Sequence, residues 1–253
     1  MNNPKRSWKS QGGFGLTEVM MSLFLACILM TVLTQLYLNN KTQYIHTRKS
    51  LDEQFDLQWV QDLLVDSIRR AGFTPCLGLD ALHAIDKRVN PVSITGVKID
   101  NERQEIKVNR MSEHFSLVQK FLGSRKILLE KAVVNDTKRP LLIADCYHAE
   151  VQTIQRIETV DKGSLVILSQ PLQFSYSRAA YAGEWLEERW FIQTNPKGRG
   201  ALYYQLGQTE ELTPLIHSLH TKSQHIFGKS LLEITLGLDN AKTKKITVAV
   251  RGS

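Results

Sequence analysis

Helix-breaking residues are absent from a long N-terminal part of this sequence. No glycine occurs between Gly15 and Gly72, and no proline occurs between Pro4 and Pro75. Because glycine and proline are the residues that most often end a helix, nothing obvious interrupts one across this interval. At about 1.5 Å per residue, a helix of about 55 residues would extend for about 80 Å. The sequence therefore predicts a single long helix near its N-terminus.

Charge is nearly absent from the first part of this interval. Between Phe14 and Leu38, a run of 25 residues, the only charged side chain is that of Glu18. Such a run is long enough to cross a hydrocarbon core about 30 Å thick. The small residues of an ordinary signal-peptide cleavage site are also missing after the run, where the sequence continues NNK. We therefore expect the apolar segment to be kept in the mature protein.

Groupings of residues typical of enzymes and metal sites are scarce. Gly228-Lys229-Ser230 has the ending of a phosphate-binding loop, but Ser223 stands where that loop needs a glycine. His217, His220 and His225 have the spacing of a metal site, but no carboxylate or cysteine stands among them. We interpret them as solvated loop histidines, with metal binding as the alternative. We expect neither catalysis nor a bound cofactor.

The charge balance and the length are ordinary. The 253 residues, which allow one large or two small domains, include 32 basic and 25 acidic side chains, a net charge of +7. The first 13 residues hold three of the basic side chains, Lys5, Arg6 and Lys9, so without them the balance is 29 minus 25, or +4. This mild basicity is too diffuse to indicate nucleic-acid binding. A hydrophobic content of 42% is enough for a packed core.

The carboxylate of Glu18 needs a physical explanation. At the centre of a bilayer a charged side chain costs about 2.5–3.5 kcal/mol, although the headgroup layer would tolerate it at less cost. If the chain were cut after Gly13, Phe14 would carry a free α-amine close to the depth of Glu18. In an assembly of staggered helices, the amine of one subunit would neutralise the carboxylate of its neighbour. Buried charges usually persist only when they are paired in this way.

The residues at this junction resemble the type IV prepilin signature. Gly13 stands before the cut, Phe14 is first in the mature chain and Glu18 is fifth. The resemblance implies that a prepilin peptidase cleaves after Gly13 and methylates the amine of Phe14. It also implies that Glu18 guides the subunit into a filament. The alternative is a plain signal anchor with a chance glutamate.

Beyond Lys41 the predicted helix becomes amphipathic. Apolar residues recur at steps of three, four and seven: Tyr44, Leu51, Phe55, Trp59, Leu63 or Leu64, and Ile68. We expect this stripe to dock on the chain's own β-sheet, since its spacing is too irregular for a free coiled coil. The expected organisation is a leader peptide (1–13), a transmembrane and filament-core helix (14–38), its amphipathic continuation (39–72) and a β-rich periplasmic head (73–253).

The remainder of the sequence changes to the period of β-strands. Predicted strands are Val92–Ile99, Glu105–Val108, Glu150–Ile157, Leu165–Leu168, Glu188–Thr194, Leu202–Leu206, Leu231–Leu238 and Lys245–Val250. Residues 239–242 between the last two suit a hairpin loop. The stretch Asn109–Pro140 predicts a long connection or a short helix. One long helix against an antiparallel sheet gives an α+β, type IV pilin-like fold.

Three cysteines refine this expectation. Cys27 lies in the apolar run, where it would be a small side chain facing lipid or another helix. Cys76 and Cys146 lie in the predicted head, on the oxidising side of the membrane, and we expect a disulfide between them. A closed loop of about 70 residues would contribute on the order of 4 kcal/mol before strain. Two free buried thiols are the alternative.

The segments around these two cysteines extend the resemblance. Ile68–Cys76, IRRAGFTPC, is similar to the end of the helix in the PilW family of minor type IV pilins. Ala144–Val151, ADCYHAEV, resembles that family's second cysteine segment, and Glu188–Tyr204 resembles its pair of aromatic-rich strands. The chain departs from the family at its C-terminus, which follows soon after the strand 245–250.

The resemblance implies a minor rather than a major subunit. Major pilins commonly carry a proline in the membrane helix, whereas this segment has Gln35 and no proline, and the expected head is large. Such a subunit primes or caps the pilus. It resides in the bacterial inner membrane with its head in the periplasm, and then in the pilus at the cell surface. The implied partners are the prepilin peptidase, other minor and major pilins, and inner-membrane lipid before assembly.

Two alternatives lie close to this interpretation. A minor pseudopilin of a type II secretion system shares the signal, but its usual calcium site needs a carboxylate cluster, and only Glu233 and Asp239 stand near the C-terminus. A pilus-tip subunit that captures DNA would use basic turns such as Lys197 and Arg199, with Lys242, Lys244, Lys245 and Arg251 as a second cluster. We favour two ordinary solvated turns over a nucleic-acid site.

Overall fold

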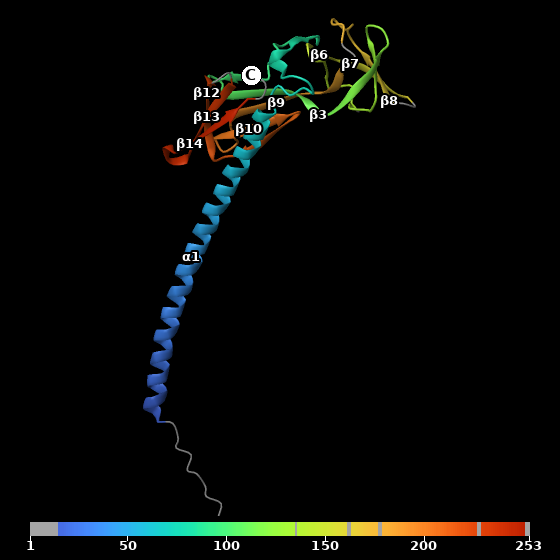
Figure 1. Cartoon of the computed structure of the whole chain (residues 1–253). Helices are drawn as coiled ribbons and strands as arrows, with labels where there is room; N and C mark the ends of the chain where they lie inside the picture. Colours follow the sequence, from blue (N-terminus) through green and yellow to red (C-terminus); the bar gives the residue numbers. More distant parts are fainter. Residues whose placement is uncertain (1–14, 135, 161–162, 177–178, 227–228, 251–253) are drawn as a thin grey trace, which may run out of the picture. The chain divides into compact units, whose positions relative to one another are not determined.

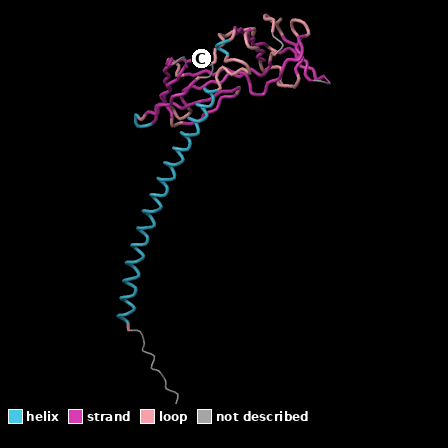
Figure 2. Tube along the Cα trace, in the orientation of Figure 1, coloured by secondary structure: helices cyan, strands magenta, loops and turns pink. Residues whose placement is uncertain are grey.

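The computed structural model describes residues 15–134, 136–160, 163–176, 179–226 and 229–250 (Figures 1 and 2). The chain divides into two compact units, Met1–Phe55 and Asp56–Ser253, and we call the second one the head unit. Figure 2 shows one long helix followed by strands and loops. The helix, α1, contributes residues to both units.

Helix α1 spans Leu16–Arg69, a length of 54 residues. The long helix predicted from the absence of glycine and proline is confirmed. Its end coincides with the first glycine after the interval: Gly72 has a φ of 68°, a conformation in which a side chain would be strained. The amide of Gly72 donates to the carbonyl of Asn109 at 2.8 Å, which ties the end of the helix to the sheet.

The head unit consists mainly of strands, with two short 3₁₀ turns, η1 (Leu79–Ala81) and η2 (Asp239–Ala241). The strands are β1 (His83–Asp86), β2 (Val97–Asp100), β3 (Glu105–Phe121), β4 (Lys126–Leu129), β5 (Leu141–Ala144), β6 (His148–Gln152), β7 (Ile154–Val160), β8 (Gly163–Leu168), β9 (Tyr181–Thr194), β10 (Gly200–Leu206), β11 (Gln208–Thr213), β12 (Ile216–Ile226), β13 (Lys229–Leu238) and β14 (Thr243–Ala249).

The strands form two sheets. The larger has the order β1-β6-β5-β9-β3-β4-β8-β7, with β10 added to β9, β11 to β10 and β2 to β3. The smaller has the order β12-β13-β14. Among the described strands, β1 and β6 form the one parallel pair, so the sheets are antiparallel-rich as predicted. Figure 1 shows β12–β14 at one end of the head unit and β7 and β8 at the other.

The prediction for Asn109–Pro140 is wrong. Strand β3 continues to Phe121 and is followed by β4, and β3 pairs with β9 over most of its length. The register of this pairing shifts between Met111 and Phe115, which breaks the alternation that marks a strand in sequence. Several strands were not predicted at all: β1, β5, β11 and β12. The final hairpin of β13 and β14 around residues 239–242 is confirmed.

The face of α1 that packs into the head unit differs in part from the predicted stripe. The buried helix residues are Val60, Leu64, Ser67 and Ile68, which join strand residues such as Trp190 and Ile234 in one core. Four residues of the predicted stripe are exposed instead: Tyr44 65%, Leu51 47%, Phe55 67% and Trp59 56%. Neighbouring residues point about 100° apart on a helix, so the rows through Trp59 and Val60 are adjacent. From the sequence alone, either row could be taken as the buried face of the helix.

Candidate functional site

The N-terminal part of α1 has the length and composition of a membrane anchor. Among the described residues, α1 is the one helix that is long and apolar enough to cross a membrane. Large apolar side chains are exposed around it, for example Met21 (73%), Phe24 (68%) and Met30 (70%). A surface of this kind is unfavourable in water and suits lipid or other helices. The helix therefore fits a single-pass anchor.

Hydroxyl groups within this segment bond inside the helix. Ser22 Oγ donates to the carbonyl of Val19 at 2.9 Å, Thr31 Oγ1 to that of Cys27 at 2.7 Å and Thr34 Oγ1 to that of Met30 at 2.7 Å. Each bond satisfies a polar group that would otherwise need water. The polar residues of the segment are therefore compatible with a hydrocarbon environment.

Glu18 lies in the first turn of α1, while Gly13 and Phe14 lie outside the described residues. The amide of Gly15 donates to Glu18 Oε2 at 3.3 Å, and the amide of Glu18 donates to the carbonyl of Gly15 at 3.0 Å. A carboxylate in this position also interacts favourably with the positive end of the helix dipole. Within one chain Glu18 thus caps its own helix, and it is exposed.

The expected disulfide is present. Cys76, which follows the helix, is bonded to Cys146 in the turn between β5 and β6, with a Cα–Cα distance of 5.3 Å. Asp145 shapes that turn, because its Oδ1 accepts the amides of Tyr147 at 2.8 Å and His148 at 2.7 Å. The bond ties the helix exit to the sheet. The remaining cysteine, Cys27, is free and exposed on α1.

A buried polar network lies where α1 meets β3 and β9. Ser67 Oγ donates to Glu188 Oε2 at 2.5 Å, Arg110 Nε donates to Glu188 Oε1 at 2.8 Å, and Trp190 Nε1 donates to Ser67 Oγ at 3.1 Å. The Arg110 and Glu188 side chains are only 9% and 4% exposed. Burial and the Glu188 carboxylate raise the pKa of Tyr204 to about 12. The network fixes the last turns of the helix on the sheet, and the sequence alone did not predict it.

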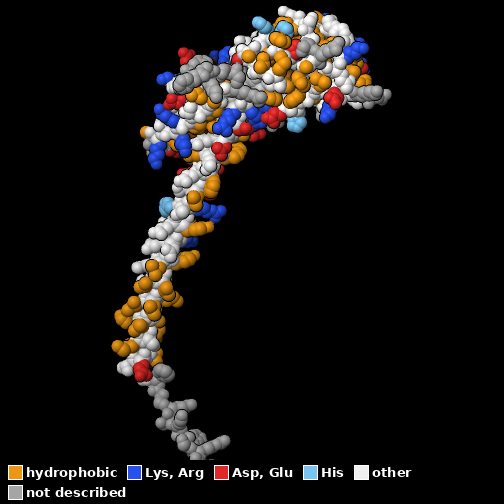
Figure 3. Space-filling view, in the orientation of Figure 1, with side chains coloured by type: hydrophobic (Ala, Val, Ile, Leu, Met, Phe, Trp, Pro, Cys, Tyr) orange, Lys and Arg blue, Asp and Glu red, His pale blue; other side chains and the backbone are white. Residues whose placement is uncertain are grey.

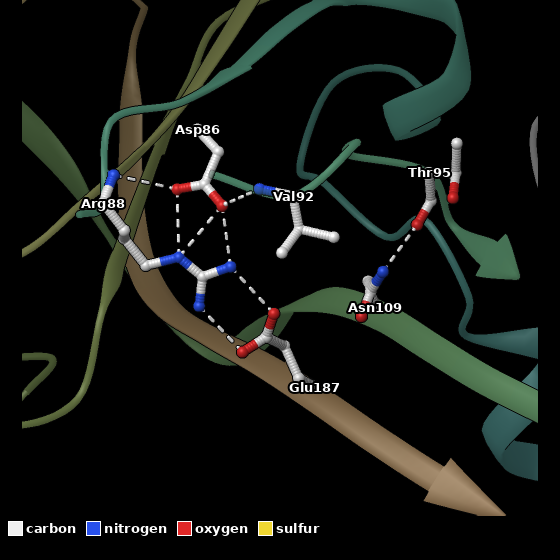
Figure 4. A network of polar contacts seen from close by, with 6 residues as sticks. All are labelled: Asp86, Arg88, Val92, Thr95, Asn109 and Glu187. Carbon is white, nitrogen blue, oxygen red and sulfur yellow. Dashed lines mark hydrogen bonds and ion pairs between the residues drawn. The ribbon is translucent and has the colours of Figure 1, made fainter. Parts of the chain in front are cut away.

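A second charged network fastens the loop after β1 (Figure 4). Arg88 Nη2 lies 2.8 Å from Asp86 Oδ2, Arg88 Nη1 lies 2.8 Å from Glu187 Oε2, and the amide of Val92 donates to Asp86 Oδ2 at 3.0 Å. Burial opposes ionisation of Asp86 and Glu187, but the hydrogen bonds from Arg88 outweigh it and lower the pKa of both carboxyls. Asn109, also in Figure 4, holds the end of this loop by donating to the carbonyl of Thr95 at 2.9 Å.

The basic turn between β9 and β10 is exposed and ordered by Asn195. The Asn195 Oδ1 atom accepts the amides of Lys197 at 3.0 Å and Arg199 at 3.1 Å, and Gly198 takes a φ of 75°. Neither Lys197 nor Arg199 forms an ion pair with a described residue. Their charges are therefore available to solvent or a partner.

His217 joins this turn to the second basic cluster. Its Nδ1 lies 2.7 Å from the carbonyl oxygen of Gly200, and its Nε2 lies 2.7 Å from Asp239 Oδ1. The carbonyl of Gly200 and then the Asp239 carboxylate raise the pKa of His217. Lys242 follows Asp239 in the loop, and Lys244 and Lys245 lie at the start of β14; all three are exposed. His217 therefore links the residue that follows one basic turn to the residue that begins the loop before the other cluster, while Arg251 lies outside the described residues.

The interpretation of the histidines as loop residues is wrong for His217 and His220, although His220 is exposed to solvent as expected. His217 and His220 belong to β12, and the side chain of His225 lies outside the described residues. In the part of the chain that the structure describes, no three His, Cys, Asp or Glu side chains form a group that would hold a metal ion.

The structure also places the carboxylates considered for a calcium site and the segment that resembles a phosphate-binding loop. Of the carboxylates considered for calcium, Glu233 pairs with Lys245 at 3.0 Å and Asp239 contacts His217. Of the phosphate-loop-like segment, Lys229 and Ser230 begin β13, and Gly228 lies outside the described residues.

No model of a known protein family matches the chain, and neither a curated protein nor a solved structure matches it. The function is therefore argued from the residues themselves.

Proposed function

We propose that this chain is a minor type IV pilin, a low-abundance subunit that primes or caps the pilus. The observation that carries the proposal is the combination of Gly13 and Phe14 in the sequence with Glu18 in the first turn of an unbroken helix of 54 residues. A secretory signal would place its cleavage site after the apolar run, and the capping contact of Glu18 with Gly15 does not by itself account for Gly13 and Phe14 before it. The prepilin signature accounts for the glycine, the phenylalanine and the glutamate together.

The proposed mechanism is assembly rather than catalysis. A prepilin peptidase cleaves after Gly13 and methylates Phe14, and α1 then holds the subunit in the inner membrane with its head in the periplasm. On assembly, the exposed apolar side chains of α1 exchange lipid for the helices of other minor and major pilins. Glu18 exchanges its capping contact with Gly15 for the N-terminal amine of a neighbouring subunit. The disulfide of the head unit suits the oxidising periplasm.

The alternative of a type II secretion pseudopilin has less support than the minor pilin. A minor pseudopilin of a type II secretion system would share the signal and the long helix. Its calcium site would need free carboxylates, whereas Glu233 and Asp239 each already contact a basic or imidazole side chain of the head unit. We therefore prefer the pilus.

Capture of DNA at the pilus tip is favoured by one specific observation. His217 contacts both Gly200, which follows the turn of Lys197 and Arg199, and Asp239, which precedes Lys242 in the loop before β14. Basic side chains on such turns suit phosphate groups. Binding of an oligonucleotide that weakens steeply with salt and is lost in the Lys197→Ala/Arg199→Ala variant would support this candidate.

Replacing Glu18 with alanine is expected to abolish assembly without affecting processing. The variant would leave the neighbour's amine unpaired in the filament core, a loss that costs about 3–5 kcal/mol for a buried pair. Immunoblots of membranes and of sheared pili would show a processed protein that is absent from the pili. Asp52→Ala, which removes an exposed acid farther along the same helix, is the control and should assemble normally. Normal incorporation of Glu18→Ala would refute the pairing.

A further inference from the structure

The small sheet β12-β13-β14 has two edges, and side chains close one of them. Asn101 Oδ1 accepts the amide of Thr221 at 2.9 Å, and Asn101 Nδ2 donates to the carbonyl of Thr221 at 2.9 Å. Gln104 Oε1 accepts the amide of Leu219 at 3.0 Å. The two side-chain amides thus take the place of a neighbouring strand along β12. Such blocking is a common protection of an otherwise exposed sheet edge.

The opposite edge, β14, is open. The amide of Val250 donates to the carbonyl of Ser230 at 2.9 Å, and the amide of Leu238 donates to the carbonyl of Lys242 at 2.8 Å. These two bonds show which residues of β14 direct their backbone groups toward β13. Backbone groups alternate in direction along an antiparallel strand. Those of Thr243, Lys245, Thr247 and Ala249 therefore point away from β13. Within the described ranges, no donor or acceptor meets them.

The charge and shape of β14 define what fits this edge. Lys242 immediately precedes β14, and Lys244 and Lys245 lie near its beginning; all three are exposed, although Lys245 also pairs with Glu233 at 3.0 Å. Figure 3 shows Lys and Arg side chains gathered at this end of the head unit. Farther along, Ile246 and Val248 face the hydrophobic core. A second copy of β14 pairing in parallel would place lysine opposite lysine, and an antiparallel copy would place the lysines opposite the uncharged far end of the strand, so neither arrangement neutralises them. An extended segment with acidic residues opposite the lysines and apolar residues opposite Ile246 and Val248 would be complementary.

We propose that β14 is a docking edge for an extended acidic segment of a neighbouring subunit, which adds to the small sheet as a further strand. Main-chain hydrogen bonds to the outward groups of β14 would provide affinity, and the lysines would select an acidic partner. Only the choice of a filament subunit as donor rests on the proposed function. The strand-accepting property belongs to the head unit and does not require cleavage after Gly13.

The test measures binding of a synthetic strand to the purified full chain in detergent micelles. The probe is a fluorescent, end-capped decapeptide of alternating glutamate and valine, and its control is the same peptide with proline at its centre. Thr247→Pro removes one outward amide of β14 and leaves the bonds to β13, since proline is tolerated on edge strands. Thr247→Val retains that amide and is the matched control. Loss of one hydrogen bond should weaken binding about fivefold to tenfold.

The outcomes separate strand addition from simple charge attraction. The proposal expects tight binding of the alternating peptide to the wild type and to Thr247→Val, weak binding to Thr247→Pro and no binding of the proline peptide. Residue-resolved hydrogen exchange should also show new protection of the Lys245 and Thr247 amides when the probe is bound. Equal binding to Thr247→Pro and Thr247→Val, equal binding of both peptides, or binding of a DNA oligonucleotide but not of the peptide would overturn the proposal. None of these results depends on leader cleavage.

Discussion

Replacing Arg110 with methionine is expected to destabilise the head unit by about 3–5 kcal/mol, because it leaves the Glu188 carboxylate buried without its cation. The Glu188 side chain is only 4% exposed, so solvent cannot compensate for the loss. For a unit of this size the melting temperature should fall by about 6–20 °C. Thermal unfolding followed by circular dichroism in detergent would measure the change.

Two further variants make this test specific. Arg103→Met removes an arginine whose side chain is 78% exposed and whose contact with Asp100 is long, 3.7 Å, so it should change stability by less than about 1 kcal/mol. The double variant Arg110→Met/Glu188→Gln removes both charges and should recover a large part of the loss. If Arg110→Met were no more destabilising than Arg103→Met, the buried network would have no role in holding α1 on the sheet.

Removal of the disulfide is expected to have an effect of similar size. Cys76 and Cys146 are 70 residues apart, so the chain-entropy model gives on the order of 4 kcal/mol for the bond. The Cys76→Ser/Cys146→Ser variant should therefore unfold at a clearly lower denaturant concentration than the wild type under oxidising conditions. A reductant should lower the unfolding midpoint of the wild type towards that of the variant and leave the midpoint of the variant unchanged. Cys27→Ser is the control, since Cys27 is a free cysteine outside the head unit. An unchanged midpoint in the double variant would show that the disulfide does not stabilise the head unit.

The parts of the fold that were predictable are those determined by local signals. The helix followed from the missing glycines and prolines, and the last hairpin followed from clear alternation on both sides of a polar turn. The region after Asn109 was not predictable in the same way. Strand β3 carries Ser112, Glu113 and His114 in succession, and its register shift removes the alternation. It is a strand because β9 pairs with it, and that pairing is non-local.

The buried network of Ser67, Arg110 and Glu188 also depends on non-local contacts and was not predictable from the sequence. Ser67, Arg110 and Glu188 are far apart in sequence, and each is individually typical of an exposed position. The one local signal was Ser67, which falls in the row of Val60, Leu64 and Ile68 on the helix. A small hydroxyl residue on an apolar row marks a place where a partner from another element is needed. The sequence does not identify that partner.

The link that His217 makes between the two basic turns was also invisible in sequence. Lys197 and Lys242 belong to different hairpins, and His217 on a third strand joins them through Gly200 and Asp239. By contrast, the significance proposed for Gly13, Phe14 and Glu18 comes entirely from the sequence. The structure contributes an unbroken helix after them, with an exposed apolar surface.

The central claim is that the chain is processed as a prepilin, and the mass of its N-terminus tests it most directly. The protein would be purified from membranes of cells that express a prepilin peptidase, with Gly13→Ala as the matched variant, and both would be analysed by intact mass spectrometry and N-terminal fragmentation. We expect a wild-type chain that begins at Phe14 and carries one methyl group on its amine, and a variant that keeps residues 1–13. A wild-type chain that retains the leader, or that is cut at any other position, would contradict it.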